Sequence, residues 1–108
     1  AESDFAAAES FCQRLDEAAE QYASRLWLAM ARQSSGELAA ARGRLDAALA
    51  YYAEAQAGFA SAGNEYELAR CLSAIAEIRL ARGTPGDIAA GREAQLESQR
   101  ILDNLGVA

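Results

Sequence analysis

The residues with the most chemical potential in this chain of 108 residues are its two cysteines, Cys12 and Cys71. A cysteine thiolate can act as a nucleophile, but it needs a neighbouring base, and the chain contains no His. Cys71 also lies on an apolar helical stripe that continues through Leu72 and Ile75, where burial raises the pKa of a thiol and makes it inert. We therefore expect two buried, free thiols without a catalytic or redox role.

Acid–base chemistry is a second possibility, because the carboxylates of Asp16, Glu17 and Glu20 lie close together in the sequence. On a helix, such a run is typical of a solvated face. The GTPG segment at 83–86 resembles a phosphate-binding loop, but the chain has no Lys for a Walker-type site. Two cysteines are also too few for a four-cysteine zinc site. We expect no enzyme activity, no cofactor and no metal site.

The composition predicts the elements that position these residues. The chain has 28 Ala and 12 Leu but only one Val and one Thr. Ala and Leu are strong helix formers, whereas the β-branched residues that favour strands are nearly absent, so the sequence predicts an all-α fold. A chain of this length holds one domain with one modest core. Its Ala-rich helices are expected to pack closely.

Charge and hydropathy restrict the partners. The formal net charge is −6, which argues against nucleic-acid binding because phosphate contacts require a basic face. No apolar run is long enough to span a membrane, and no signal peptide is visible. All ten basic residues are Arg, which together with the many Ala residues suggests a GC-rich bacterial genome. We expect a bacterial cytoplasmic protein and, because the chain does not begin with Met, a piece of a larger one.

An internal repeat organises the sequence. Residues 29–43 align with residues 69–83 after a shift of 40, and both segments end in Ala-Arg-Gly. The similarity continues into the following helix, where about three extra residues accumulate in the second copy. Short turns make consecutive helices antiparallel. The predicted organisation is a single domain, 1–108, with helix-turn-helix units at about 25–63 and 65–106 and a preceding helix at about 3–22.

Capping residues predict where the helices begin and end. Glycine takes the left-handed conformation beyond a helix C-terminus without steric cost, and Gly83 stands where an apolar pattern stops. Asn64 is followed three residues later by Glu, and Thr84 is followed by Pro, so both are expected N-caps. The break near Ala23 and Ser24 rests on the repeat alone. The expected helices span residues 3–22, 24–42, 44–62, 65–82 and 85–105.

Small and aromatic residues predict how the helices pack. Gly36 stands inside a predicted helix and its repeat counterpart is Ala76, so both positions are expected to allow the backbone of a neighbouring helix to approach. The aromatic side chains are expected in the core or between helices. Tyr51 and Tyr52 are adjacent and lie on different helix faces, so one of them is expected to be partly exposed.

The first unit resembles a tetratricopeptide repeat, in the longer-helix variety of about 40 residues found in large bacterial regulators. The resemblance rests on a small residue, a glycine seven positions later and an alanine five positions after that. It continues with an aromatic and a second small residue. These positions are occupied by Gly36, Gly43, Ala48, Tyr52 and Ala55.

The second unit follows the same spacing at first and then departs from it. Ala76 and Gly83 match the first unit, whereas Glu93 and Leu96 stand near the aromatic and small positions of the last helix. The resemblance covers about residues 25–106. It implies an antiparallel helix-turn-helix solenoid of about five helices, in which Cys12 and Cys71 lie too far apart for a disulfide, which requires Cα atoms within about 7 Å.

In this family the first helix of each unit lines a concave groove that binds an extended or helical peptide, so the resemblance implies a protein- or peptide-binding module. The corresponding groove positions are Met30, Gln33, Glu37 and Ala40 in the first unit and Arg70, Ser73, Glu77 and Leu80 in the second. Glu37 and Glu77 form an acidic stripe with Arg70 as its cation, which favours partners with basic or amide groups. The Lys and Asn residues that clamp a chaperone's C-terminal carboxylate in one subfamily are missing at these positions.

Two units and one helix make an incomplete array, so we expect a part of a larger bacterial regulatory or scaffold protein.

Two alternatives to a binding module stay open. The alternative function is that of a homo-oligomerising helical bundle, which acts as a structural or assembly module and must form a stable oligomer. A third possibility is a small enzyme that uses carboxylates.

Overall fold

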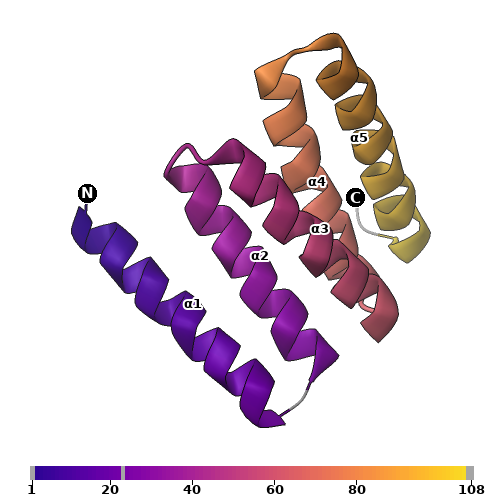
Figure 1. Ribbon diagram of the computed structural model, residues 1–108. Coiled ribbons are helices and arrows are strands. Elements are labelled where there is room, and N and C mark those ends of the chain that lie inside the picture. The colour runs from indigo at the N-terminus through magenta and orange to yellow at the C-terminus, as the bar shows by residue number, and fades with distance from the viewer. Residues whose placement is uncertain (1, 23, 107–108) are drawn as a thin grey trace.

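A computed structural model describes residues 2–22 and 24–106, which form five helices in an extended array (Figure 1). Among these residues 91% are helical and none is in a strand, so the prediction of an all-α fold with five helices is confirmed. The helices are α1 (Glu2–Tyr22), α2 (Arg25–Ala41), α3 (Leu45–Ala62), α4 (Glu65–Arg82) and α5 (Pro85–Leu105).

The helices lie side by side in chain order, and each runs antiparallel to the one before it (Figure 1). The most extensive contacts join α2 to α3 and α4 to α5, and smaller interfaces join α1 to α2 and α3 to α4. Each helix therefore packs almost only against its neighbours in the sequence. The array measures 36 × 31 × 22 Å.

Polar side chains start the helices at the expected places. Ser24 Oγ accepts a hydrogen bond from the backbone N–H of Trp27 at 3.3 Å, which places the start of α2 directly after the predicted break. Asn64 Oδ1 accepts from the N–H of Glu67 at 3.2 Å, as predicted for α4. The helix bounds agree with the predicted ones to within one residue. Ala23, on the other side of the predicted break, lies outside the described residues.

The main core lies between α2, α3 and α4. Its largest fully buried side chains are those of Phe59 and Cys71. Small residues surround them, because Ala side chains allow the helix axes to come close together. The buried members are Ala29, Ala39, Ala48, Tyr52, Ala55, Phe59, Cys71 and Ile78. A second cluster, Ala69, Leu72, Ala76, Ala94 and Ile101, holds α5 against α4.

Glycines mark the closest approaches between helices. A Cβ atom at Gly58 would lie 2.8 Å from the Cβ of Ala29, so α3 meets α2 there without room for any side chain. At Gly36 a Cβ would lie 3.2 Å from ring atoms of Tyr52. The expectation that Gly36 admits a neighbouring backbone was therefore wrong, because the group that needs the space is an aromatic ring of α3.

A buried carboxylate fixes the turn between α4 and α5. Asp87 is 4% exposed and accepts hydrogen bonds from Arg79 at 3.0 Å and from Arg82 at 3.1 and 3.2 Å. Thr84 donates to the same carboxylate at 2.8 Å, and its hydroxyl oxygen accepts from the N–H of Asp87 at 3.1 Å. Arg82 also reaches Asp46 of α3 at 2.6 Å. The Arg82 guanidinium is the main group that holds the pKa of Asp87 below its usual range.

This cluster predicts a loss of stability in acid. A carboxyl group whose pKa is lower in the folded state stabilises the fold above its unfolded pKa of about 4, and this contribution disappears as the pH falls through the folded value. Asp87→Asn should therefore lower the midpoint of thermal unfolding at pH 7, and the difference from the parent chain should shrink as the pH falls below about 4. Circular dichroism across this range measures both effects. Glu93→Gln, at an exposed position of α5, is the control. Its midpoint of thermal unfolding should follow that of the parent chain across this pH range.

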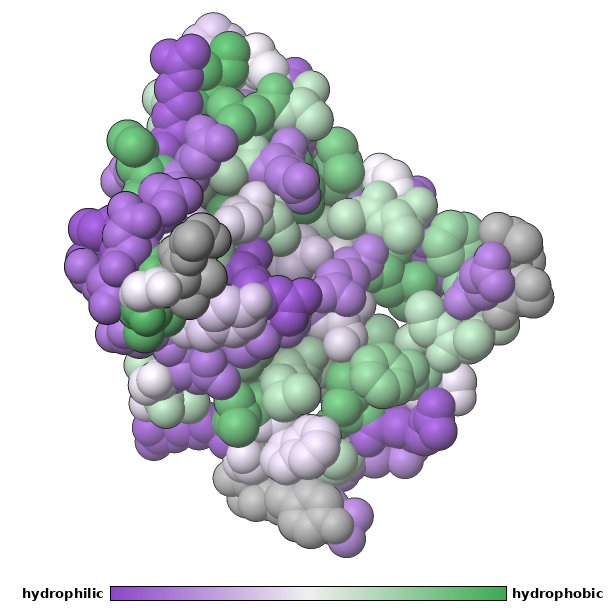
Figure 2. Space-filling model, turned by 180° about the vertical axis from the view of Figure 1, so that it is seen from behind, coloured by the Kyte–Doolittle hydropathy of each residue, from purple (hydrophilic) through white to green (hydrophobic). Residues whose placement is uncertain are grey.

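Apolar and hydrophilic side chains are interspersed over the face opposite to that of Figure 1, as Figure 2 shows. Several large apolar side chains at the N-terminal end of the array are more than a third exposed. They are Phe11, Leu26, Trp27, Leu28 and Met30. Of the aromatic residues expected in the core or between helices, Phe59 and Tyr52 are buried in the core, whereas Phe11, Trp27 and Tyr66 are 38–49% exposed. In the described part of the chain, no helix has the length and hydropathy to cross a membrane.

Candidate functional site

The four predicted groove residues of the second unit come together in one hollow. Arg70, Ser73, Glu77 and Leu80 follow one another at intervals of three and four residues, so they lie on one face of α4. They line a hollow of about 490 Å³ between α4 and α5, which we call the α4–α5 groove. Its other lining residues are Tyr66, Ala74, Ala76, Gln95 and Leu102.

A serine pair sets the polarity of this groove. Ser98 Oγ is buried and donates its single proton to the carbonyl oxygen of Ala69 at 2.8 Å. Ser73 Oγ lies 2.7 Å from Ser98 Oγ, so Ser73 must be the donor in that contact. The exposed Ser73 hydroxyl can then only accept hydrogen bonds from a ligand. Together with the Glu77 carboxylate it gives the groove acceptors for a donor-rich partner.

Ser98 also corrects an expectation about the last helix. The repeat spacing placed Leu96 near the small-residue position of the last helix, but Leu96 is 72% exposed. Ser98 is 3% exposed and packs against α4, as Ala55 of α3 packs in the first unit. The turn before α5 is no longer than the turn before α3, but α5 has 21 residues and α3 has 18, so the extra residues of the second unit lie within the helix.

Charges of both units converge near the centre of the array. Arg70 lies 3.2 Å from Glu67, which is the main cause of its raised pKa, and the charge of Glu37 on α2 contributes as well. Burial raises the pKa of Tyr52 to about 12, and the charges of Glu37 and Glu77 add to this rise. Glu37, Arg70 and Glu77 therefore lie within electrostatic reach of the same tyrosine. The acidic stripe with one cation stays a prediction, because Glu37 and Glu77 line separate hollows.

The first-unit residues do not line the α4–α5 groove. Met30 is 37% exposed near the N-terminal end of α2. Gln33 is only 9% exposed and offers little surface to a partner. Ala40 is half-buried against the main core. Glu37 is exposed and lines a separate hollow between α1 and α2, beside Phe11.

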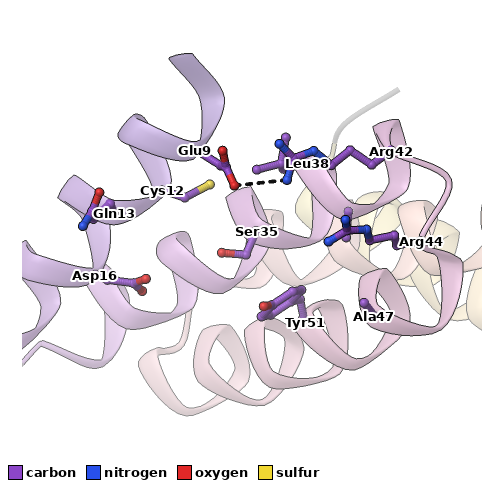
Figure 3. Close-up of a pocket in the computed structure, with 11 residues that line it drawn as sticks. Glu9, Cys12, Gln13, Asp16, Ser35, Leu38, Arg42, Arg44, Ala47 and Tyr51 are labelled. Carbon is purple, nitrogen blue, oxygen red and sulfur yellow. Dashed lines mark hydrogen bonds and ion pairs between the residues drawn. The ribbon is translucent and has the colours of Figure 1, made fainter. Parts of the chain in front are cut away.

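Sequence reasoning missed a larger hollow of about 590 Å³ between α1, α2 and the start of α3 (Figure 3). Arg42 donates to Glu9 across it at 3.1 Å, and its guanidinium stands 5.1 Å from the centre of the Phe5 ring. Arg42 is also the main cause of the lowered pKa of Glu9. Tyr51, which is 37% exposed, contributes to the lining, as does Arg44. Tyr51 is thus the partly exposed member of the adjacent tyrosine pair, as predicted.

The cysteines are free and buried, as predicted. Burial raises the pKa of the Cys71 thiol to about 12, and burial is also the main cause of the raised pKa of Cys12. Cys12 lines the hollow of Figure 3, near Ser35. Neither thiol is activated as a nucleophile by these surroundings.

Thiol labelling tests this burial directly. In the folded protein at pH 8, iodoacetamide should modify Cys71 far more slowly than in 6 M guanidinium chloride, because the sulfur is both inaccessible and protonated. Cys12, at 8% exposure, should react at an intermediate rate. Mass spectrometry of tryptic peptides measures each site separately. Rapid, complete labelling of native Cys71 would contradict the packing of α4 against α3.

The acidic residues give no metal site within the residues that the structure describes. Asp16 pairs with Arg32 at 3.2 Å across α1 and α2, and Glu17 and Glu20 are exposed, as expected for a solvated face. The GTPG segment at 83–86 is a helix cap, in which Thr84 starts α5. The polar groups of the α4–α5 groove can hold a partner by hydrogen bonds and charge.

The fold is an array of antiparallel helical hairpins. At its C-terminal end lies the α4–α5 groove, which is lined by both polar and apolar side chains. No family model, curated protein or solved structure matches the chain. The resemblance to tetratricopeptide repeats therefore stays a prediction from the sequence.

Proposed function

We propose that this chain is a protein- or peptide-binding module of the tetratricopeptide type and that its partner binds in the α4–α5 groove. The observation that carries the proposal is the convergence of Arg70, Ser73, Glu77 and Leu80 in one hollow. The groove combines apolar walls with hydrogen-bond acceptors, which is the usual composition of a binding site. The acidic net charge of the chain adds long-range attraction for a basic partner.

We also propose where the module acts. The chain acts as part of a larger bacterial regulatory or scaffold protein in the cytoplasm and binds without catalysis, cofactor or nucleic acid. Its two free thiols fit a reducing compartment, where cysteines rarely form disulfides.

Selection from a library of random phage-displayed peptides tests the binding site. We expect the enriched peptides to carry Arg or Lys, and we expect Glu77→Arg to weaken their binding by about 1 kcal/mol or more. The unfolding free energy should change by less than about 0.5 kcal/mol, because the side chain is exposed. Isothermal titration calorimetry at two salt concentrations measures the affinity and its electrostatic share.

Glu93→Arg is the matched control, because it makes the same charge reversal at an exposed position outside the groove. Arg70→Glu should also alter binding, since it makes the groove wholly acidic. If neither groove reversal changes the affinity and Tyr51→Ala abolishes binding, the functional surface is the hollow of Figure 3. If the library yields no binding peptide, the binding function itself is wrong.

One observation favours the alternative, a homo-oligomerising assembly module. The exposed side chains Leu26, Trp27 and Leu28 follow one another at the start of α2, and Phe11 lies exposed on α1. Exposed apolar groups of this kind are typical of contacts between subunits. Sedimentation equilibrium separates the two functions, because an assembly module forms a stable oligomer that Trp27→Glu disrupts.

A further inference from the structure

The α4–α5 groove has a counterpart in the first unit that is partly covered. Under the 40-residue repeat, Ser73 and Ala76 of α4 correspond to Gln33 and Gly36 of α2. Leu102 of α5 corresponds in the same way to Phe59 of α3, with the three extra residues of the second unit. Gln33 and Phe59 are buried, whereas Ser73 and Leu102 line an open groove. Met30 and Glu37, which correspond to Arg70 and Glu77, are exposed in the first unit as well.

The helix that covers the first-unit surface is α4. Cys71 and Ile78 of α4 belong to the same core cluster as Phe59, with Leu68 and Ile75 packed against it. These four residues form one apolar stripe along the helix. The groove thus repeats a surface whose natural occupant, in this same molecule, is an amphipathic helix.

The two units also carry an acidic residue at corresponding positions, Glu37 and Glu77. Arg70 of α4 lies within electrostatic reach of Glu37, an exposed residue of α2. The counterpart of Glu37 in the open groove is Glu77, which makes no ion pair with the described residues. An occupant that repeats the position of α4 would bring a cation to Glu77, as α4 brings Arg70 to Glu37.

We infer that the α4–α5 groove binds an amphipathic helix of a protein partner, in the position that α4 takes on α2 and α3. The helix presents small or aliphatic residues at spacings of three and four toward Ala76, Leu80 and Leu102, and an Arg or Lys toward Glu77. This inference rests on the proposed function and specifies the conformation and chemistry of the partner. A helix suits the groove because it satisfies its own backbone hydrogen bonds, whereas Ser73 can accept but cannot donate to an extended backbone.

The sequence of α4 itself supplies a probe. A capped synthetic peptide of residues 64–83 carries the stripe and the arginine that the groove should recognise, and the first-unit surface is already partly covered by the protein's own α4. We expect the peptide to bind the intact chain and to gain helical circular dichroism on mixing. NMR amide shifts should change at Ser73, Ala76 and Leu102.

A charge swap makes the test specific. Glu77→Arg in the protein should weaken peptide binding about tenfold, and Arg70→Glu in the peptide should do the same. Combining the two variants should restore the affinity to within about threefold, since the pair is then reversed but complementary. Glu77→Gln is the milder protein variant if the reversal disturbs the fold, and Glu93→Arg is the control that should bind as the parent chain does.

The outcomes separate the inference from the function on which it rests. If library-selected peptides bind in the groove but gain no helix, and the α4 peptide does not bind at millimolar concentration, the helical occupant is wrong while the binding function stands. Binding without rescue by the charge swap also overturns the inference. If the chain alone self-associates and Glu77→Arg abolishes this, the occupant is a second copy and the partner helix is wrong.

Discussion

Replacing Phe59 with Ala is expected to lower the free energy of unfolding by about 3–5 kcal/mol. The ring is fully buried in the main core, where α2, α3 and α4 meet, and its removal leaves a cavity that rigid helices fill only in part. Domains of this size are stable by only about 5–15 kcal/mol in total, so the variant should be close to unfolding at 37 °C. Denaturant titration followed by circular dichroism measures the loss.

Phe11→Ala provides a matched control, because it makes the same substitution at a ring that is 49% exposed. Its cost should stay below about 1 kcal/mol. If both variants lose the same free energy of unfolding, the Phe11 ring is buried against another molecule.

Gly58→Leu is expected to destabilise the chain by about 3 kcal/mol, through crowding instead of a cavity. A Cβ at this position would already lie 2.8 Å from the Cβ of Ala29, which is itself 1% exposed. A leucine must therefore push α3 away from α2 and loosen the main core. Ala57→Leu, at the exposed neighbouring position, should change the stability by less than about 0.5 kcal/mol.

A compensating pair separates crowding from other effects of the substitution. Gly58→Ala alone should be destabilising despite the better helix propensity of Ala, because its methyl group collides with that of Ala29. Adding Ala29→Gly removes the collision, so the double variant should be more stable than the sum of the two single changes implies. Additive effects would mean that the two helices do not touch at this point.

The sequence predicted the helix ends well because they depend on local chemistry. The side chain of Asn64 caps α4 and that of Thr84 caps α5, and each forms the hydrogen bond that its residue type and spacing indicated. Gly83 takes the left-handed conformation that ends α4. The start of α2 had less support in the sequence, since only the repeat indicated it.

Features that depend on three helices at once were not predictable. The burial of Gln33 depends on the helices that pack around α2, which no pattern within α2 can indicate. The same is true of Asp87, whose sequence position showed a helix start but not its two arginine partners on α4. Repeat spacing did predict that the groove residues of α4 share a face. It did not identify Gln95 of α5 as part of the wall, because the alignment was displaced there.

Contacts made almost only between neighbouring helices also have a consequence for how the chain folds. Each helical pair can assemble after closure of one short loop, so the relative contact order is low and folding is expected to take microseconds to milliseconds. The terminal helices α1 and α5 each have a single main neighbour, so opening should begin at either end. Amide hydrogen exchange should then be fastest in α1 and α5, slower in α2 and α4, and slowest in α3.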